Sequence, residues 1–576
     1  MSDYQPRLED IQFILNQVLH APARLGELPV FEEVDADLMA QVLQEAGKFV
    51  AAEIAPLNRI GDEVGAQWHQ GAVTMPAGFK DAYQAFWQAG WASLTSAPED
   101  GGQALPAVLD SVLYEWLSGA NHGWTMAPGI LHGAYECIKH HASEALKAQY
   151  VHKLGTGEWL ATMCLTEPHA GSDLGLATTR AVAQADGSYQ IRGTKIFISG
   201  GEHDLSENIV HLVLARLPDA PPGPKGLSLF LVPKYYADGS PSAVHCERIE
   251  EKMGIHASPT CVMRFDEATG WLVGEPGRGL NAMFVMMNAA RLHVALQGVG
   301  LLDAAWQKAN AYAHERRQMR APKPAGIKGE ATDFIIEHPA VRRILDTQRA
   351  WIDGARVLAY KTGLALDVAK HHPDAAQRES AQRWCALTTP ILKAACTDQG
   401  FHGASECLQV FGGHGYVREW GIEQNLRDAR IAMIYEGTNE IQAIDLLMRK
   451  VVADGGAALH AVLDELAQGL SATQAHEAQV LDLFAQLRAL TAQALATAQV
   501  PDGNVRLGWI AGDFLRLTAL ALLAWSWTQI EVALQTQPSG PDVATRWHAP
   551  AAALRAWVLP EFGMRAQMVR AQCSPA

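Results

Sequence analysis

The strongest constraint on the fold is a pair of runs that alternate between polar and apolar residues and are joined by a tight turn. Residues 179–185 and 189–199 alternate in this way, and Asp186-Gly187 lies between them. Successive side chains of a strand point to opposite faces, and Asp-Gly suits a two-residue hairpin loop. Further runs with strand character are residues 209–217, 227–233 and 260–265. The sequence therefore predicts a compact β domain over residues 161–278.

Helical spacing of apolar residues precedes and follows this β domain. Residues 35–160 predict an N-terminal helical domain after an extension over residues 1–34. Residues 279–452 contain long helical segments with short connections, which predict a helical bundle. An Asp-Gly-Gly linker at residues 454–456 leads to a further Ala/Leu-rich helical domain over residues 457–576. The predicted fold class is mainly α with a central β domain, because a chain of this length is too long for a single core.

Composition excludes several functional classes. A net charge of −16 disfavours binding to nucleic acid or to an anionic membrane. The N-terminus has no basic and apolar leader, and the longest apolar run, residues 517–527, is shorter than the ~20 residues that a bilayer needs. We therefore expect no secretory signal, no transmembrane segment and a cytoplasmic location. The eight cysteines are scattered and form no CxxC pair, which favours free thiols and no metal site.

A lone carboxylate is the main candidate for chemistry. In residues 427–442 an apolar segment ends at Glu436 and Gly437, Asn439 suits the N-cap of a new helix, and Gln442 would complete a capping box. Glu436 then lies outside the helix among apolar neighbours, where desolvation would raise its pKa towards neutrality. Such a carboxylate can act as the base for a carbon acid, although an ordinary loop glutamate has the same local pattern.

Three other segments contain glycines and hydroxyls in patterns that suit a ligand. Residues 163–173 place hydroxyls and an Ala-Gly pair in a loop, which favours a cradle of backbone N–H groups. Residues 193–200 end a strand with an aromatic residue and a hydroxyl. Residues 408–416 place three glycines in four positions after a helix, which allows a close approach of another backbone or a ligand. Each segment alone is equally typical of a turn, a strand end or a helix C-cap.

Taken in order, these segments resemble the acyl-CoA dehydrogenase family over residues 35–452. The extended N-terminus and the C-terminal helical domain look like the large bacterial branch that contains 3-methylmercaptopropionyl-CoA dehydrogenases. The resemblance implies a helical domain, a β-barrel-like domain, a four-helix bundle and an additional helical domain. It also implies FAD-dependent α,β-desaturation of an acyl-CoA to a trans-2-enoyl-CoA in fatty acid β-oxidation. An electron-transfer flavoprotein or an equivalent acceptor and a homo-oligomer, at least a dimer, are the implied partners.

The resemblance also assigns roles to individual residues. Glu436 matches the catalytic base, its backbone N–H matches an oxyanion donor, and hydride passes from the substrate to the flavin. The implied FAD contacts are Met163, Leu165, Thr166, Ser172, Phe197, Ser199, Arg316, Gln409, Gly412, Gly413, Thr438 and Glu440. Among these, Arg316, Gln409, Gly412 and Gly413 match residues that reach the FAD of a neighbouring subunit. The implied substrate contacts are Ser172, Asn288, Arg291 and Gly437.

Several positions depart from the family pattern. Phe197 stands where many relatives have tryptophan against the flavin, and Met163 stands where many have tyrosine. His169 and Ala170 replace a common glycine-alanine pair. Glu440 replaces a frequent glutamine or glycine. The departures affect flavin contacts and leave the base unchanged.

Two alternative functions and the acyl group stay open at this point. An acyl-CoA oxidase would carry the same motifs, but its reduced flavin would react with oxygen. A DNA-associated flavoprotein of the same fold has a basic C-terminal domain, whereas residues 451–576 contain seven arginines, no lysine and ten acidic residues. The substrate could be 3-methylmercaptopropionyl-CoA or a short- or medium-chain acyl-CoA.

Overall fold

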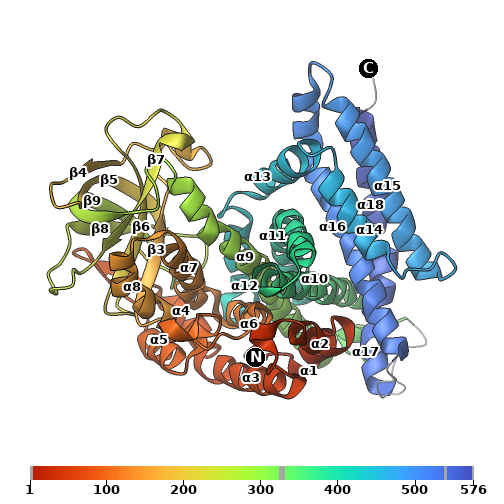
Figure 1. Ribbon diagram of the computed structural model, residues 1–576. Coiled ribbons are helices and arrows are strands. Elements are labelled where there is room, and N and C mark those ends of the chain that lie inside the picture. The colour runs from red at the N-terminus through yellow and green to blue at the C-terminus, as the bar shows by residue number, and fades with distance from the viewer. Residues whose placement is uncertain (1–3, 323–330, 537–540, 574–576) are drawn as a thin grey trace. The chain divides into compact units, whose positions relative to one another are not determined.

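Two compact units make up the chain (Figure 1). The computed structural model describes residues 4–322, 331–536 and 541–573. The barrel unit comprises residues 48–105 and 120–293, and the helical unit comprises residues 1–47, 106–119 and 294–576. The expected mainly α fold with a central β domain is confirmed. The division of the sequence into five parts remains a prediction.

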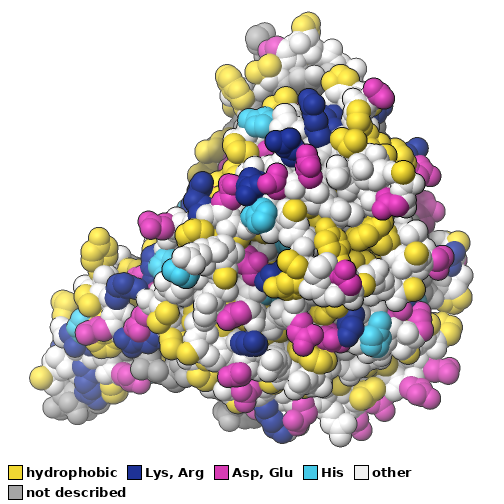
Figure 2. All heavy atoms as spheres, turned by 90° about the vertical axis from the view of Figure 1, so that its left-hand side faces the viewer, with side chains coloured by type: hydrophobic (Ala, Val, Ile, Leu, Met, Phe, Trp, Pro, Cys, Tyr) yellow, Lys and Arg dark blue, Asp and Glu magenta, His cyan; other side chains and the backbone are white. Residues whose placement is uncertain are grey.

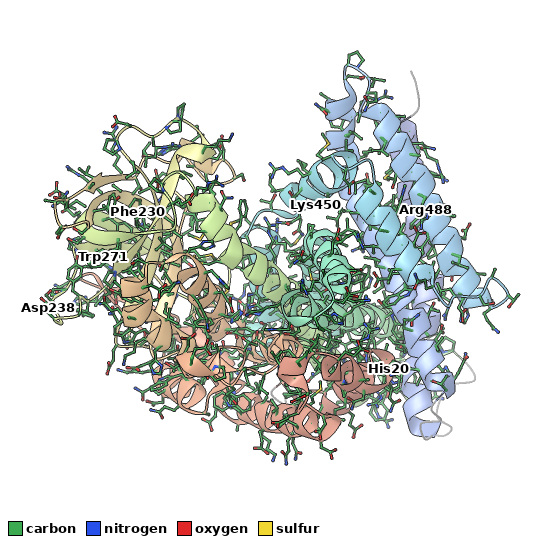
Figure 3. The ribbon with its side chains drawn as sticks, in the orientation of Figure 1. His20, Phe230, Asp238, Trp271, Lys450 and Arg488 are labelled. Atoms are coloured by element: carbon green, nitrogen blue, oxygen red, sulfur yellow. The ribbon has the colours of Figure 1, made fainter. Side chains whose placement is uncertain are left out.

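A closed ring of strands forms the centre of the barrel unit. The strands are β3 (Leu160–Cys164), β4 (Arg180–Ala183), β5 (Tyr189–Ser199), β6 (Ile209–Arg216), β7 (Leu227–Pro233), β8 (Val244–Ile249) and β9 (Thr260–Val273). Neighbouring strands follow the order β6-β4-β5-β9-β7, and β7 pairs with β6 to close the ring. Strand β3 joins β6 in parallel and β8 joins β9. Phe230 on β7 and Trp271 on β9 mark two of the paired strands in Figure 3.

The predicted hairpin is confirmed. Strands β4 and β5 pair antiparallel with Ala183 opposite Tyr189, and Gly187 in the turn has a φ of +86°. Helices α7 (Leu131–His141) and α8 (Glu144–Thr156) pack their apolar faces on buried leucines of β6 and β7. The unit also contains α4 (Leu57–Val64), α5 (Phe79–Gln88), β1 (Gln67–His69) and β2 (Ala72–Thr74).

A buried ion pair fixes the loop after β3 to strand β5. The Lys195 ammonium lies 2.9 Å from the Glu167 carboxylate, and it donates to the Leu165 carbonyl at 2.9 Å. Glu167 also accepts hydrogen bonds from the backbone N–H and hydroxyl groups of Thr178 and Thr179. Burial alone would raise the pKa of Glu167, but the charge of Lys195 and these hydrogen bonds lower it to about 2. The loop therefore has one strongly preferred position on the barrel.

Long antiparallel helices form the helical unit. Its helices are α1 (Leu8–Phe13), α2 (Ala21–Gly26), α3 (Ala36–Phe49), α10 (Pro339–His371), α11 (Ala375–Val410), α12 (Ile422–Ala429), α13 (Asn439–Ile444), α14 (Ala457–Ala467), α15 (Ala475–Thr497), α16 (Gly503–Thr536), α17 (Pro541–Ala553) and α18 (Pro560–Cys573). Helix α13 continues as a π-helix over Asp445–Val452. Two further helices, α6 (Ala107–Thr125) and α9 (Gly279–Glu315), have residues in both units, and the last two residues of α3 belong to the barrel unit.

The C-terminal helices pack on the bundle of their own chain. Trp527 on α16 donates its indole N–H to the Ala350 carbonyl on α10 at 2.8 Å. A side chain at Gly354 would come within 2.5 Å of Leu523, so α10 and α16 approach closely at this glycine. Figure 1 shows α15, α16 and α18 side by side. Helix α16 is long and apolar enough to cross a membrane, but 72% of its most apolar window is buried inside the protein.

A buried network of charges joins helices α6, α9 and α10. The Arg356 guanidinium lies 2.6 Å from Glu115 and 2.9 Å from Asp303, and all three side chains are fully buried. Arg349 on α10 contacts Asp10 of the N-terminal segment at 2.7 Å. Asp10 in turn lies 2.7 Å from an arginine of α17. The network therefore ties the first helix, the bundle and the C-terminal helices together.

We predict that Glu167→Gln destabilises the barrel unit by roughly 3–5 kcal/mol at pH 7, because it leaves the Lys195 ammonium buried without a carboxylate. The folded pKa of Glu167 is lowered to about 2 from 4.5, so its stabilisation is present above pH 4.5 and is lost as the pH falls from there towards 2. Thermal unfolding at pH 7 and at pH 3 should show a smaller difference between wild type and mutant at pH 3. The exposed Glu207→Gln is the control. An equal difference in stability between wild type and Glu167→Gln at both pH values would contradict the prediction.

A chain truncated after Val452 should aggregate, because it loses α14 to α18 and uncovers the apolar surface of α10 around Ala350 and Trp351. Size-exclusion chromatography with light scattering measures this directly. A monodisperse and fully active truncated protein would show that the C-terminal helices form a separable module.

Candidate active site

Glu436 lies in a strained turn of the helical unit. The turn follows a 3-10 helix over Arg430–Met433 and precedes α13. Glu436 has a φ of +55° and Gly437 a φ of +84°, so two successive residues are left-handed. This conformation costs a residue with a side chain roughly 1–2 kcal/mol, and it persists only where the surroundings impose it. Glu436 shares this conformation with a few other residues, among them Phe197 in the barrel unit, but unlike Phe197 it is followed directly by a second left-handed residue.

Side chains from two helices hold the carbonyls of this turn. Gln442 on α13 donates its amide to the carbonyl of Glu436 at 3.0 Å and to that of Gly437 at 3.3 Å. Lys393 on α11 donates to the carbonyl of Gly437 at 2.8 Å. A side chain at Gly437 would meet the Gln442 amide at 2.8 Å, so the turn leaves no space for one.

The predicted N-cap and capping box are wrong in detail. Thr438 is the N-cap of α13, and its hydroxyl accepts from the N–H of Ile441 at 3.4 Å. The Asn439 side chain is not available as a cap because it bonds to α11, where Lys393 donates to its oxygen at 3.0 Å. Gln442 reaches back as predicted, but it contacts the two carbonyls of the turn instead of a backbone N–H.

The neighbours of Glu436 are apolar. Tyr435 is half-buried and donates its hydroxyl to Gln297 on α9. Burial raises the pKa of Tyr435, and the negative charge of Glu436 adds to the increase. Ile434, Ile441 and Ile444 expose 45%, 38% and 38% of their surfaces, so the turn carries an uncovered apolar rim. Closure of this rim by a ligand would desolvate the carboxylate.

Glu440, one of the expected FAD contacts, is exposed and lies in the first turn of α13. The backbone and the Thr438 hydroxyl lower the pKa of Glu440. Thr438 itself is half-buried at the N-cap. Both residues therefore lie close to Glu436 along the chain, at the start of the same helix.

In the barrel unit, the loop after β3 lies next to the end of β5. The N–H of Ile196 donates to the carbonyl of Thr166 at 2.9 Å. Phe197 follows at a bulge in the pairing with β9, with a φ of +59° and 60% of its surface exposed. Ser199 is half-buried two residues on. An exposed aromatic ring and two nearby hydroxyls fit a flat heteroaromatic ring that stacks and accepts hydrogen bonds.

A small, largely apolar cavity opens in the same unit. Its lining residues are Gly129, Ile130, Gly133, Met163, Met286, Ala290 and His293. A side chain at Gly133 would come within 3.0 Å of the Met286 backbone, which explains why glycine occupies this position. Of these residues, only Met163 was an expected ligand contact, and Met286 belongs to a methionine cluster whose sequence pattern indicates core packing.

The remaining expected residues of the barrel unit are less informative. Leu165 is half-buried and packs on the core, with its carbonyl held by Lys195. Ser172 is exposed in the loop after β3, and Arg291 is half-buried on α9. The side chain of Asn288 lies outside the described residues.

The structure brings Arg316 close to the glycine loop after α11. Tyr312, one turn before Arg316, stacks on Phe411 at 4.2 Å between ring centroids and hydrogen-bonds to His414 at 2.9 Å. Gln409 is exposed in the last turn of α11, and Gly412, Gly413 and Arg316 are exposed as well. No heavy atom lies within 4 Å of a side chain built at either glycine. An exposed guanidinium beside open backbone fits an anionic ligand such as a diphosphate.

Family models match most of the chain. The N-terminal, middle and C-terminal domains of acyl-CoA dehydrogenases match residues 39–158, 162–268 and 277–451. A 3-methylmercaptopropionyl-CoA dehydrogenase from Ruegeria pomeroyi is 43% identical over 91% of this chain and 90% of its own length. A broad-specificity linear acyl-CoA dehydrogenase from Mycobacterium tuberculosis is 35% identical over 91% of this chain and 89% of its own.

Solved structures confirm the fold. An acyl-CoA dehydrogenase from Bacillus anthracis, complexed with FAD, matches with a TM-score of 0.76 at 21% identity over 96% of this chain and 91% of its own. FAD is the expected cofactor, and it is the cofactor of the family. The exposed Phe197 and the hydroxyls of Thr166 and Ser199 fit its flavin ring. The loop beside Arg316 fits its diphosphate. The family and the oxidoreductase class that the motifs predict are thereby confirmed: this chain belongs to the acyl-CoA dehydrogenase family.

Proposed function

We propose that Glu436 is the base with which this acyl-CoA dehydrogenase removes the α-proton of its acyl-CoA substrate. The observation that carries the proposal is the strained Glu436–Gly437 turn, which is held by Gln442 and Lys393 and carries an apolar rim. A carboxylate in such a place is fixed in position and becomes desolvated when a ligand covers it. Both properties suit a general base.

The chain supplies three further elements of the reaction. The backbone N–H of Glu436 donates to the thioester oxygen and stabilises the charge that develops there as the α-proton leaves. Gly437 keeps the approach to this N–H free of a side chain. When bound, FAD accepts the hydride from the β-carbon. Phe197 stacks on the ring of the cofactor, and the Thr166 and Ser199 hydroxyls hydrogen-bond to it.

The diphosphate and the substrate have separate sites in this proposal. Arg316, with the loop that contains Gln409, Gly412 and Gly413, binds the diphosphate side of the FAD of a second subunit. Ser172, Asn288, Arg291 and Gly437 contact the substrate, and Met163, Leu165, Thr438 and Glu440 complete the cofactor contacts. The enzyme is therefore at least a homodimer.

We propose a short acyl group as the substrate. The cavity of the barrel unit is small and contains two methionines, whose polarisable sulfurs suit a thioether or a short alkyl chain. The similarity to a 3-methylmercaptopropionyl-CoA dehydrogenase supports the thioether, and the similarity to a broad-specificity enzyme supports linear chains. A kcat/KM series over acyl-CoAs of increasing length, including the thioether, with an artificial electron acceptor decides between them.

An electron-transfer flavoprotein or an equivalent protein takes the electrons in the cytoplasm. Formation of H₂O₂ with acyl-CoA as the sole co-substrate would indicate the alternative, an acyl-CoA oxidase. Nucleic acid is not a partner in this proposal, because residues 451–576 are net acidic. On the face shown in Figure 2, acidic and basic side chains are interspersed, which does not favour a polyanion.

Glu436→Gln should abolish reduction of the flavin by substrate while FAD and enoyl-CoA still bind. Loss of a general base costs about 10²–10⁴-fold, and glutamine keeps the size and the backbone N–H. Under anaerobic mixing the mutant should stay yellow yet show a spectral shift on ligand binding. Glu406→Gln, an exposed site on α11, is the matched control. Rapid bleaching of Glu436→Gln would place the base elsewhere, with Glu440 as the first alternative.

Arg316→Ala should lower both the flavin occupancy and the thermal stability of the dimer, because a ligand that binds only the folded state stabilises it. A tenfold loss of affinity at saturating FAD corresponds to about 1.4 kcal/mol. Flavin absorbance measures the occupancy, analytical ultracentrifugation the oligomeric state and thermal unfolding the stability, with the exposed Arg342→Ala as control. A monomeric protein with full, tight FAD would disprove the dimer-dependent site.

A further inference from the structure

Helices α16 and α18 of the helical unit expose a row of apolar side chains each. Trp509 on α16 exposes 71% of its surface, more than any other described tryptophan, and Val505 one turn before it exposes 59%. Met564 and Met568 on α18 expose 49% and 47%. Together with the small and polar residues between them, these side chains form what we call the α16/α18 face. Its exposed residues are Asn504, Val505, Gly508, Trp509 and Gly512 of α16 and Pro560, Gly563, Met564, Gln567, Met568 and Ala571 of α18.

Ion pairs between the two helices bring the two rows together. Arg565 of α18 lies 2.6 Å from Asp513 of α16, and Arg516 of α16 lies 3.1 Å from Glu561 of α18. The later residue of α16 thus pairs with the earlier residue of α18, so the helices run antiparallel, and Figure 1 shows them side by side. The four ion-paired side chains are half-buried between the exposed rows. Both rows therefore lie on the same side of the helix pair and form one continuous surface.

The α16/α18 face carries no charge. Every exposed residue of α16 between Gly503 and Arg516 is uncharged, and the one exposed charge of α18, Arg570, donates to Gln486 on α15 at 3.4 Å. The chain as a whole has a net charge of −16, so two copies repel each other over most of their surfaces. A neutral face lets two copies meet without placing like charges opposite each other. None of its residues is basic, which disfavours an anionic membrane as the occupant.

The shape of the face suits contact with a copy of itself. Side chains built at Gly508, Gly512 and Gly563 would meet no heavy atom within 4 Å, so open positions lie next to Trp509 and Met564. In a two-fold contact the same surface belongs to both copies, so a large side chain of each copy can fill an open position of the other. The four large side chains expose on the order of 500 Å², and the residues around them bring the face towards the about 800 Å² that each partner of a standard interface buries.

We propose that a second copy of this chain covers the α16/α18 face in a two-fold contact, with Trp509 at its centre. The contact lies on different helices from Arg316 and the glycine loop after α11, which we assign to the FAD of a second subunit. A chain that uses both contacts therefore forms a tetramer from two dimers. The inference rests on the exposed residues of α16 and α18, and it is independent of the proposed base and of the proposed FAD site.

The test is Trp509→Glu in the full-length enzyme loaded with FAD. This change places two carboxylates close together in the two-fold contact, and loss of a central tryptophan weakens an interface by roughly 30-fold or more. We expect the molar mass from light scattering at micromolar concentration to fall to half that of the wild type, while flavin occupancy and cooperative unfolding are retained. Val505→Glu should have the same effect. Val532→Glu is the matched control, because it changes an exposed valine near the other end of the same helix, and it should keep the wild-type mass.

Three results would overturn the proposal. Equal molar masses of the wild type and folded Trp509→Glu would show that no second copy covers the face, and a monomeric wild type would show the same. Flotation of the wild type with phosphatidylcholine vesicles, abolished by Trp509→Glu, would assign the face to a lipid surface instead. If Trp509→Glu does not fold, the mass of Val505→Glu decides. The FAD site is tested separately by Arg316→Ala, which should lower flavin occupancy, whereas Trp509→Glu should not.

Discussion

The buried ion network around Arg356 is the interaction on which the geometry of the helical unit depends. Arg356 bridges Glu115 of α6 and Asp303 of α9, and all three side chains are removed from water. Burial raises the pKa of Glu115 despite its contact with Arg356, whereas arginines hold the pKa of Asp303 below its usual range against the effect of burial. Loss of one partner of such a pair typically costs about 3–5 kcal/mol, because it leaves the other charge buried and unpaired.

This network reaches the turn of the base through a short series of contacts. Arg356 lies on α10, and α10 is joined to α11 by a hydrogen bond of 2.8 Å between the amides of Gln399 and Gln348. Helix α11 then holds Gly437 and Asn439 through Lys393. The strain of the turn is thus offset by a rigid scaffold of packed helices rather than by local contacts alone. The same scaffold includes α16, which packs on α10 at Gly354.

Sequence patterns predicted the structure correctly where the structure depends on residues that are close together in the chain. The Asp186-Gly187 hairpin and the long helices follow from periodicity and turn chemistry, and both appear in the structure. The candidate loops followed from motif order. Contacts between distant residues could not be predicted in this way. Glu167 and Lys195 both lie in recognised motifs, but only the closure of the barrel pairs them. The N-cap was placed at Asn439 instead of Thr438 because nothing local shows that α11 binds the Asn439 side chain.

Each unit has a non-glycine residue in the left-handed conformation at its functional loop. In each unit a buried lysine also donates a hydrogen bond to a backbone carbonyl near that residue. In the barrel unit, Lys195 holds the Leu165 carbonyl beside the segment of Phe197. In the helical unit, Lys393 holds the Gly437 carbonyl beside Glu436.

The two lysines connect different parts of the chain. Lys195 contacts the carboxylate of Glu167 and the Leu165 carbonyl, so it fixes the loop after β3 to strand β5. Lys393 donates to the carbonyl of Gly437 and to the side-chain oxygen of Asn439, so it fixes the turn and the start of α13 to helix α11. A left-handed residue with a side chain persists only where its surroundings impose that conformation. In both units the buried lysine belongs to the surroundings that do so.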